Sequence, residues 1–130
     1  DLPLDGNYIF RPYNLTDIKD FIQLKEHSFA IDLNSWGSVN FVSGEVNRGD
    51  KVYPAVYLTN EHDDILYKFQ ASFKTGSKIK QASIKDINND GLKDVMITTE
   101  FIDDPGAESI EWIFYQMSNG LFYDSELNGN

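Results

Sequence analysis

The clearest signal for the fold lies in residues 65–74, which read Ile-Leu-Tyr-Lys-Phe-Gln-Ala-Ser-Phe-Lys. Apolar side chains at 65, 67, 69, 71 and 73 alternate with polar ones at 68, 70, 72 and 74. Successive side chains of a β-strand point to opposite faces of the sheet, so this alternation predicts a strand with one face buried and one face in water. Such half-buried strands are typical of antiparallel sheets.

Further strands are predicted on both sides of this segment. Upstream, Val39, Phe41 and Val46 indicate one strand, and a second covers residues 52–58, where Pro54 indicates an edge or a bulge. Downstream, strands are expected at 79–84, 95–101, 110–117 and 121–123, and Ser118-Asn119-Gly120 is a hairpin turn between the last two. A short strand at 8–10 is also predicted, and apart from it the sequence favours about six to seven strands joined by short turns.

A helix is expected near the N-terminus, over residues 14–27. Asn14 has the side chain of an N-cap, and Asp17, three residues later, completes a capping box. Leu15, Ile18 and Ile22 form an apolar stripe of roughly helical period. One N-terminal helix followed by a mostly antiparallel sheet predicts the α+β class. We expect a single domain over residues 1–130.

Composition narrows the class of partner. The 130 residues contain 11 basic and 21 acidic side chains, which gives a formal net charge of −10. Nucleic-acid-binding proteins present basic patches, so this balance argues against a nucleic-acid partner. With no cysteine, the chain forms neither disulfides nor thiolate metal sites. No apolar run approaches the roughly 20 residues of a membrane-spanning helix.

The segment that carries chemistry is residues 86–94, which read Asp-Ile-Asn-Asn-Asp-Gly-Leu-Lys-Asp. Oxygen-bearing side chains fall at Asp86, Asn88, Asp90 and Asp94, and Gly91 allows a sharp turn. Calcium binds six to eight oxygen ligands, so these four side chains and the Leu92 carbonyl form a plausible five-ligand set. The alternative is a metal-free polar turn, in which the same side chains accept hydrogen bonds from main-chain N–H groups.

This loop departs from the EF-hand pattern, because Ile97 occupies the place of the closing bidentate glutamate and β-type segments flank the loop. Instead it resembles the calcium loops of FG-GAP and VCBS repeats, which carry Asp-x-Asn/Asp-x-Asp-Gly-x-x-Asp between two strands. The resemblance covers about a tenth of the chain, in a single copy, and does not imply a whole propeller. It implies calcium bound by Asp86, Asn88, Asp90, Leu92 and Asp94, in a stabilising role.

We therefore expect a non-enzymatic, calcium-stabilised module with a protein or glycan partner that the sequence does not identify. A site with few carboxylates is expected to bind weakly, on the order of 10⁻⁴–10⁻³ M, which favours a location outside the cytosol. The chain begins at Asp1 rather than Met, in keeping with removal of a leader. The expected location is extracellular or at the cell surface, as a secreted or a lipid-anchored protein of bacterial type.

Two other classes of function stay open at this point. A small metal-dependent hydrolase would combine the loop with Glu100 or Glu108, and an acidic inhibitor or immunity-type protein would bind a basic target. His62 and its neighbours Asp63 and Asp64 are expected to form a solvated turn. Trp36 and Trp112 are weaker candidates for an aromatic binding surface.

Overall fold

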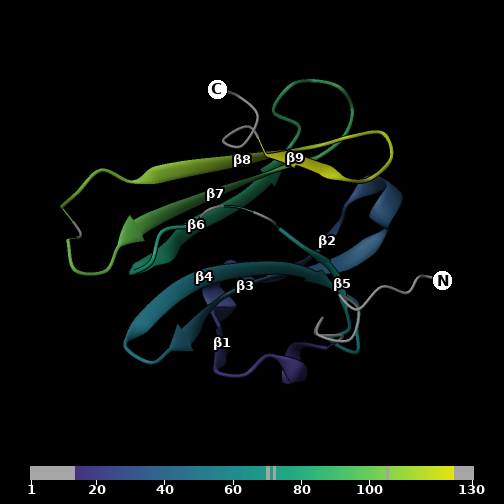
Figure 1. Cartoon of the computed structure of the whole chain (residues 1–130). Coiled ribbons are helices and arrows are strands. Elements are labelled where there is room, and N and C mark those ends of the chain that lie inside the picture. The colour runs from purple at the N-terminus through teal and green to yellow at the C-terminus, as the bar shows by residue number, and fades with distance from the viewer. Residues whose placement is uncertain (1–13, 70, 72, 105, 125–130) are drawn as a thin grey trace, which may run out of the picture.

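Two antiparallel sheets packed face to face form the molecule in the computed structural model, which describes residues 14–69, 71, 73–104 and 106–124 (Figure 1). The first sheet contains β1 (Phe21–Gln23), β2 (Phe29–Asp32), β3 (Ser38–Arg48), β4 (Lys51–Thr59) and β5 (Ile65–Lys68). The second contains β6 (Ser77–Lys85), β7 (Asp94–Phe101), β8 (Ile110–Gln116) and β9 (Phe122–Asp124). The described helices are single 3₁₀ turns, η2 (Leu15–Asp17), η3 (Lys25–His27) and η4 (Asn34–Trp36).

The two sheets have simple connections. β3 is the long central strand of the first sheet, where β1 and β2 pair along one of its edges and β4 along the other. β6 to β9 follow one another in the order of the chain, so the second sheet is a meander. The predicted turn at Ser118-Asn119-Gly120 is confirmed, with Gly120 N–H donating to the Met117 carbonyl.

The core lies between the sheets, and side chains of both contribute to it. Phe41 and Val56 come from the first sheet, and Ile97 and Phe114 from the second, and each of them is at most 1% exposed. Phe69, which follows β5, contacts the rings of both Phe41 and Phe114. This shared apolar layer is what holds the two sheets together, because burial of apolar surface is the main favourable term in folding.

A smaller apolar cluster covers the opposite face of the first sheet. Leu15, Ile18 and Phe21 from the N-terminal segment pack there against β3 and β4. Gly44 of β3 makes room for them, since a Cβ at this position would lie 2.4 Å from the Ile22 carbonyl oxygen and 2.6 Å from the Phe21 ring.

The predicted N-terminal helix is wrong, and with it the α+β class, because the described chain is nearly all β. The capping box does form, with the Asn14 side chain accepting from Thr16 N–H and Asp17 accepting from Asn14 N–H. It caps only one 3₁₀ turn, since Ile18 is already extended and Asp20 has a φ of 61°. Of the apolar stripe, Leu15 and Ile18 pack against the first sheet instead, whereas Ile22, which lies in β1, is 51% exposed.

The predicted strand over 65–74 is also too long. β5 ends at Lys68. The last backbone hydrogen bond to the first sheet here is made by the Phe69 N–H, which donates to the Val56 carbonyl. The chain then crosses toward the second sheet and returns at Gly76, whose N–H donates to the Val52 carbonyl. Between these two contacts Pro54 lies at an edge of β4 that β5 does not pair, as its residue type indicated.

The remaining predicted strands are present, with ends shifted by one or two residues. The strand expected at 8–10 lies outside the described residues. The helices in the described part of the chain are 3₁₀ turns of three residues, which are too short to span a bilayer.

Candidate metal centre

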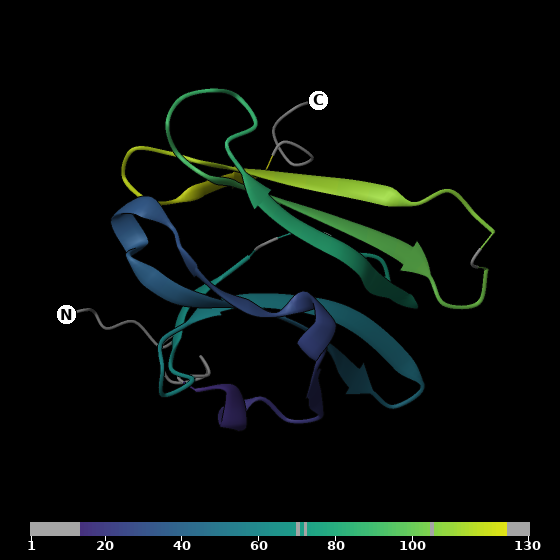
Figure 2. The same cartoon turned by 180° about the vertical axis from the view of Figure 1, so that it is seen from behind.

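The loop 86–93 connects β6 to β7, so it does lie between two strands as the sequence predicts. Figure 2 shows it beyond the arrowhead of β6, on the same side of the molecule as the turn between β8 and β9. Two residues of the loop have left-handed backbones, Asn89 with a φ of 62° and Gly91 with a φ of 87°. These two residues reverse the chain within a few positions, which brings side chains from both ends of the loop together.

The three aspartates of the loop converge. Carboxylate oxygens of Asp86, Asp90 and Asp94 all lie within 4.8 Å of one another. Two oxygens on opposite sides of a calcium ion are separated by about twice the Ca–O distance, or roughly 5 Å. The three carboxylates therefore fit the coordination sphere of a single ion of this size.

The Asn88 side chain completes a ring of oxygen-bearing groups. The end of its amide lies 3.2 Å from Asp86 Oδ1, 3.0 Å from Asp90 Oδ1 and 3.3 Å from Asp94 Oδ2. With its oxygen turned inward, Asn88 joins three carboxylates in a cluster of four oxygens, which only a cation would stabilise. With its nitrogen turned inward, Asn88 donates hydrogen bonds to the same carboxylates, which is the metal-free form of the loop.

Main-chain N–H groups hold each carboxylate in place. Asp86 accepts from Asp90 N at 3.1 Å and from Gly91 N at 2.8 Å. Asp90 Oδ1 accepts from Leu92 N at 2.9 Å. A carboxylate has about four lone-pair sites, so these bonds leave capacity for a metal ion on each residue.

Asp94 has the most demanding surroundings of the three, because it is 0% exposed. Its Oδ2 accepts from Ile87 N at 2.8 Å and its Oδ1 from Gln116 N at 2.9 Å, so both of these partners are neutral. Burial of an ionised carboxylate is unfavourable unless a positive charge compensates it.

The two nearby lysines do not supply that charge. Lys85 ends β6 and Lys93 lies in the loop, yet within the described chain neither forms an ion pair with the three aspartates at 4.0 Å or less. The Lys93 ammonium group instead donates to the Asp32 carbonyl at 2.6 Å. The like-charge repulsion among the aspartates is therefore unrelieved by any close side-chain cation in the described part of the chain.

Two residues far away in the sequence join the site. Asn34 Oδ1 accepts from Lys93 N at 2.9 Å and from Gln116 Nε2 at 3.2 Å. Sequence reasoning missed both Asn34 and Gln116, since they lie 59 and 82 residues from their partners in these bonds. Hydrogen bonds across such separations leave no spacing pattern in a single sequence.

The other acidic candidates lie elsewhere. Neither Glu100 nor Glu108 belongs to the group of carboxylates formed by the loop. Glu100 instead approaches Lys78 of the neighbouring strand at 3.9 Å. His62 is in an exposed turn, as expected, with its N–H donating to Asn60 Oδ1.

Both tryptophans have internal partners. Trp112 is 2% exposed and its ring N–H donates to Thr99 Oγ1 at 3.1 Å. Trp36 is half-buried, and its ring N–H donates to the Gly120 carbonyl at 2.6 Å. The described contacts of both rings are those of packing residues.

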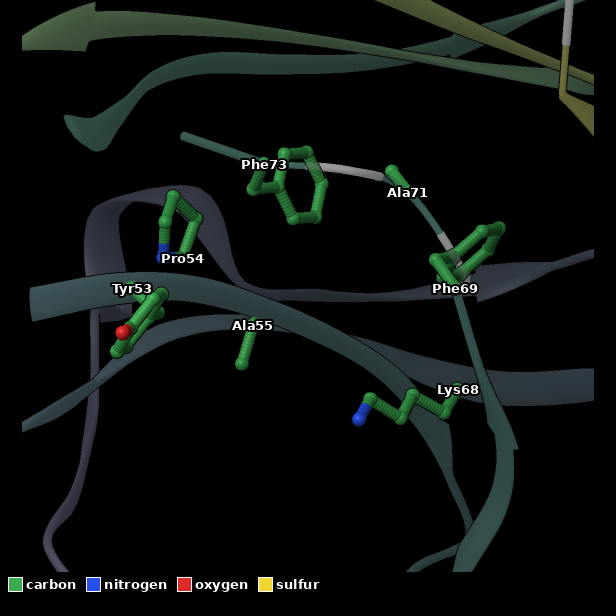
Figure 3. Close-up of a pocket in the computed structure, with 7 residues that line it drawn as sticks. All are labelled: Tyr53, Pro54, Ala55, Lys68, Phe69, Ala71 and Phe73. Carbon is green, nitrogen blue, oxygen red and sulfur yellow. The ribbon is translucent and has the colours of Figure 1, made fainter. Parts of the chain in front are cut away.

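A small cleft of about 140 Å³ lies beside the unpaired edge of β4 (Figure 3). Among the described residues that line it, most side chains are apolar or aromatic and Lys68 alone is charged. Its lining residues are Tyr53, Pro54, Ala55, Lys68, Phe69, Ala71 and Phe73. Pockets for small molecules usually enclose about 300 Å³ or more, so this cleft is small for a ligand site.

Comparisons with protein-family models, with curated proteins and with solved structures find no match to this chain. Inference about the acidic loop therefore rests on its sequence and on the geometry of this structure.

Proposed function

We propose that the loop 86–94 binds one calcium ion and that this ion stabilises the folded domain. The observation that carries the proposal is the convergence of Asp86, Asp90 and Asp94, whose carboxylate oxygens lie within 4.8 Å of one another. The proposed ligands are the side chains of Asp86, Asn88, Asp90 and Asp94 and the main-chain carbonyl of Leu92. The sequence of this loop resembles the calcium-binding loops of FG-GAP and VCBS repeats, and this resemblance supports calcium as the ion.

Calcium is favoured over magnesium by the type of ligand. The loop offers only oxygen atoms, which suits either ion, but it offers as many as five from one short segment. Calcium accepts six to eight such ligands at 2.3–2.6 Å in flexible geometry, whereas magnesium keeps several waters and demands a tight octahedron. A loop that supplies most of the ligands itself therefore suits calcium.

The proposed role is structural. A cation would neutralise the buried Asp94 and its two exposed or half-buried neighbours, and would join the end of β6 to the start of β7. An ion bound only by the folded state adds about 2.7 kcal/mol at 100 times its dissociation constant.

The proposed location follows from the expected affinity. With three carboxylates and no bidentate glutamate at the closing position, we expect a dissociation constant on the order of 10⁻⁴–10⁻³ M. Calcium reaches such concentrations outside the cytosol, so we propose that the protein is exported or lies at the cell surface.

Thermal unfolding with the substitution Asp90→Asn tests the proposal. The variant keeps the shape and the Oδ1 acceptor of Asp90 but removes its charge. In calcium we expect the variant to melt several degrees below the wild type, since it loses much of the roughly 2–3 kcal/mol that the ion supplies. In excess chelator we expect it to melt at the same temperature or higher, because repulsion with Asp86 and Asp94 is relieved.

The matched control is Asp104→Asn, which removes one charge from an exposed loop outside the group. Its melting temperature should respond to calcium as the wild type does, and magnesium should replace calcium poorly in all three proteins. Equal losses for Asp90→Asn in calcium and in chelator would contradict the proposal, as would a wild type whose unfolding calcium does not shift.

A further inference from the structure

The residue between two of the proposed ligands is held from outside the loop. Lys93 lies between Leu92 and Asp94, and three of its polar groups have partners in other elements. Its N–H donates to Asn34 Oδ1 at 2.9 Å, its carbonyl accepts from Gln116 Nε2 at 2.8 Å, and its ammonium group donates to the Asp32 carbonyl at 2.6 Å. The path of the chain at Lys93 is therefore set by the first sheet and by β8.

The contact with Asn34 orients a proposed ligand directly. The Lys93 N–H belongs to the same peptide unit as the Leu92 carbonyl, and in a planar trans peptide the two point in opposite directions. By holding the N–H, Asn34 turns the Leu92 carbonyl away from η4. A hydrogen bond to the N–H also polarises the peptide, which makes its carbonyl oxygen a better ligand for a cation.

Gln116 fixes the second ligand. Its main-chain N–H donates to Asp94 Oδ1, and its side chain, which is 0% exposed, spans the Lys93 carbonyl and Asn34 Oδ1. Asn34 Oδ1 thus accepts from both Lys93 and Gln116. Removal of this one oxygen would leave a buried amide donor with one partner fewer and would release the Leu92–Lys93 peptide.

Asn34 itself is well anchored. It has a φ of 59°, and its N–H donates to Asp32 Oδ1 at 3.1 Å. The rest of η4 rests on the turn between β8 and β9, through the bond from the Trp36 ring to the Gly120 carbonyl. The 3₁₀ turn is therefore tied both to the loop and to the second sheet.

We propose that Asn34 is a positioning residue of the cation site, and that ion binding is coupled to the docking of η4 against the loop. This inference rests on the proposed function. In it, Asn34 touches no ion and acts through the Leu92–Lys93 peptide and Gln116. Because binding couplings are reciprocal, the ion should tighten η4 as much as η4 favours the ion.

Calcium titration of the full chain by calorimetry tests this coupling with two variants. Asn34→Gly tolerates the left-handed backbone but removes the acceptor oxygen. We expect its dissociation constant for calcium to rise about 10-fold, the lower end of what loss of supporting hydrogen bonds does at metal sites. Asn34→Asp keeps an acceptor oxygen in the same place, so its affinity should return to near that of the wild type.

Asn40→Ala is the matched control. Asn40 lies on β3 of the first sheet. Its side chain donates to the Asn60 carbonyl at 3.3 Å, away from the loop. Its removal should lower the melting temperature without changing the calcium affinity. This separates loss of a ligand-orienting contact from a general loss of stability.

Amide hydrogen exchange of the wild type adds a test that needs no substitution. Calcium should slow exchange at Trp36 and Gly37, whose N–H groups bond within η4, as well as in the loop. Unchanged affinity in Asn34→Gly, or slowed exchange in the loop with none in η4, would overturn the coupling and leave the proposed function standing. A wild type that binds no calcium would overturn both.

Discussion

Asn14 shows how one side chain joins two distant segments. Its Oδ1 caps η2, while its Nδ2 donates to the His62 carbonyl at 2.9 Å and to Asp64 Oδ1 at 3.0 Å. These hydrogen bonds to the Asp64 carboxylate, first from Asn14 and then from Asn60, lower the pKa of Asp64. Both ends of the Asn14 amide are therefore engaged, the oxygen in the cap and the nitrogen in the contact with residues 62 and 64.

The lowered pKa makes part of the stability depend on pH. A group whose pKa is lower in the folded chain than in the unfolded one stabilises the fold above its unfolded pKa. That stability is lost as the pH falls through the folded value. We therefore expect Asn14→Ala to raise the pKa of Asp64, measured by NMR titration, and to weaken the difference in stability between neutral and acid pH.

Asn14→Ser separates the two roles of this residue. Serine keeps an oxygen that can cap η2 but loses the amide that bonds Asp64. It should raise the pKa of Asp64 as alanine does, yet retain more stability at neutral pH. If neither variant moves the pKa of Asp64, Asn14 does not control this carboxylate.

At the scale of the elements, a glycine decides how the N-terminal segment lies on the sheet. β1 pairs with β3 at residues 44–46, and the Phe21 ring covers Gly44. A Cβ there would meet both the Ile22 main-chain oxygen and the Phe21 ring, and the main-chain oxygen cannot move aside as the end of a flexible side chain can. The close approach of two strands and a ring thus depends on the missing Cβ.

We expect Gly44→Ala to destabilise the protein by about 1–3 kcal/mol, the usual effect of overpacking in a core. Denaturant unfolding measures this value, with Gly106→Ala as the control. A Cβ at Gly106 would have only the Asp104 carboxylate within reach, at 3.8 Å, so that variant should stay within roughly 0.5 kcal/mol of the wild type. Equal stability of the two variants would mean that β1 moves away at no cost.

The elements also show what a single sequence can and cannot predict. Alternation found most strands because Val39 and Phe41 face the core between the sheets while Ser38 and Asn40 do not, and the oxygen-rich spacing found the loop. The helix prediction over 14–27 is wrong because Leu15 and Ile18 of its apolar stripe pack against a sheet, and this tertiary contact overrides local preference. The alternation over 65–74 overestimates the length of the strand. Phe69 is apolar because it packs in the core between the sheets, and not because it belongs to a strand.

At the scale of the molecule, Phe69 joins the two sheets. Its ring lies 5.8 Å from that of Phe41, 5.1 Å from Phe114 and 4.9 Å from Phe122, measured between centroids. It is 2% exposed. The segment between the sheets thus places a buried aromatic side chain in contact with rings of both sheets.

Phe69→Ala should therefore remove about 3–5 kcal/mol of stability, as large-to-small changes of buried phenylalanine do. Since the whole domain is expected to have only about 5–15 kcal/mol, Phe69→Leu provides a milder test in which the fold survives. Chemical denaturation measures both. A loss below about 1 kcal/mol for the alanine variant would show that the sheets are held together elsewhere.

The division of the strands between the sheets bears on how the chain is made. Every strand pair described joins residues within 21–68 or within 77–124, so neither sheet needs the other half of the sequence for its backbone pairing. On a ribosome, where synthesis proceeds from the N-terminus, the first sheet can assemble while the second is still untranslated. Until the second sheet is made, the apolar face of the first sheet, which includes Phe41 and Val56, is exposed to solvent. The nascent half-protein is therefore the species most in need of a chaperone.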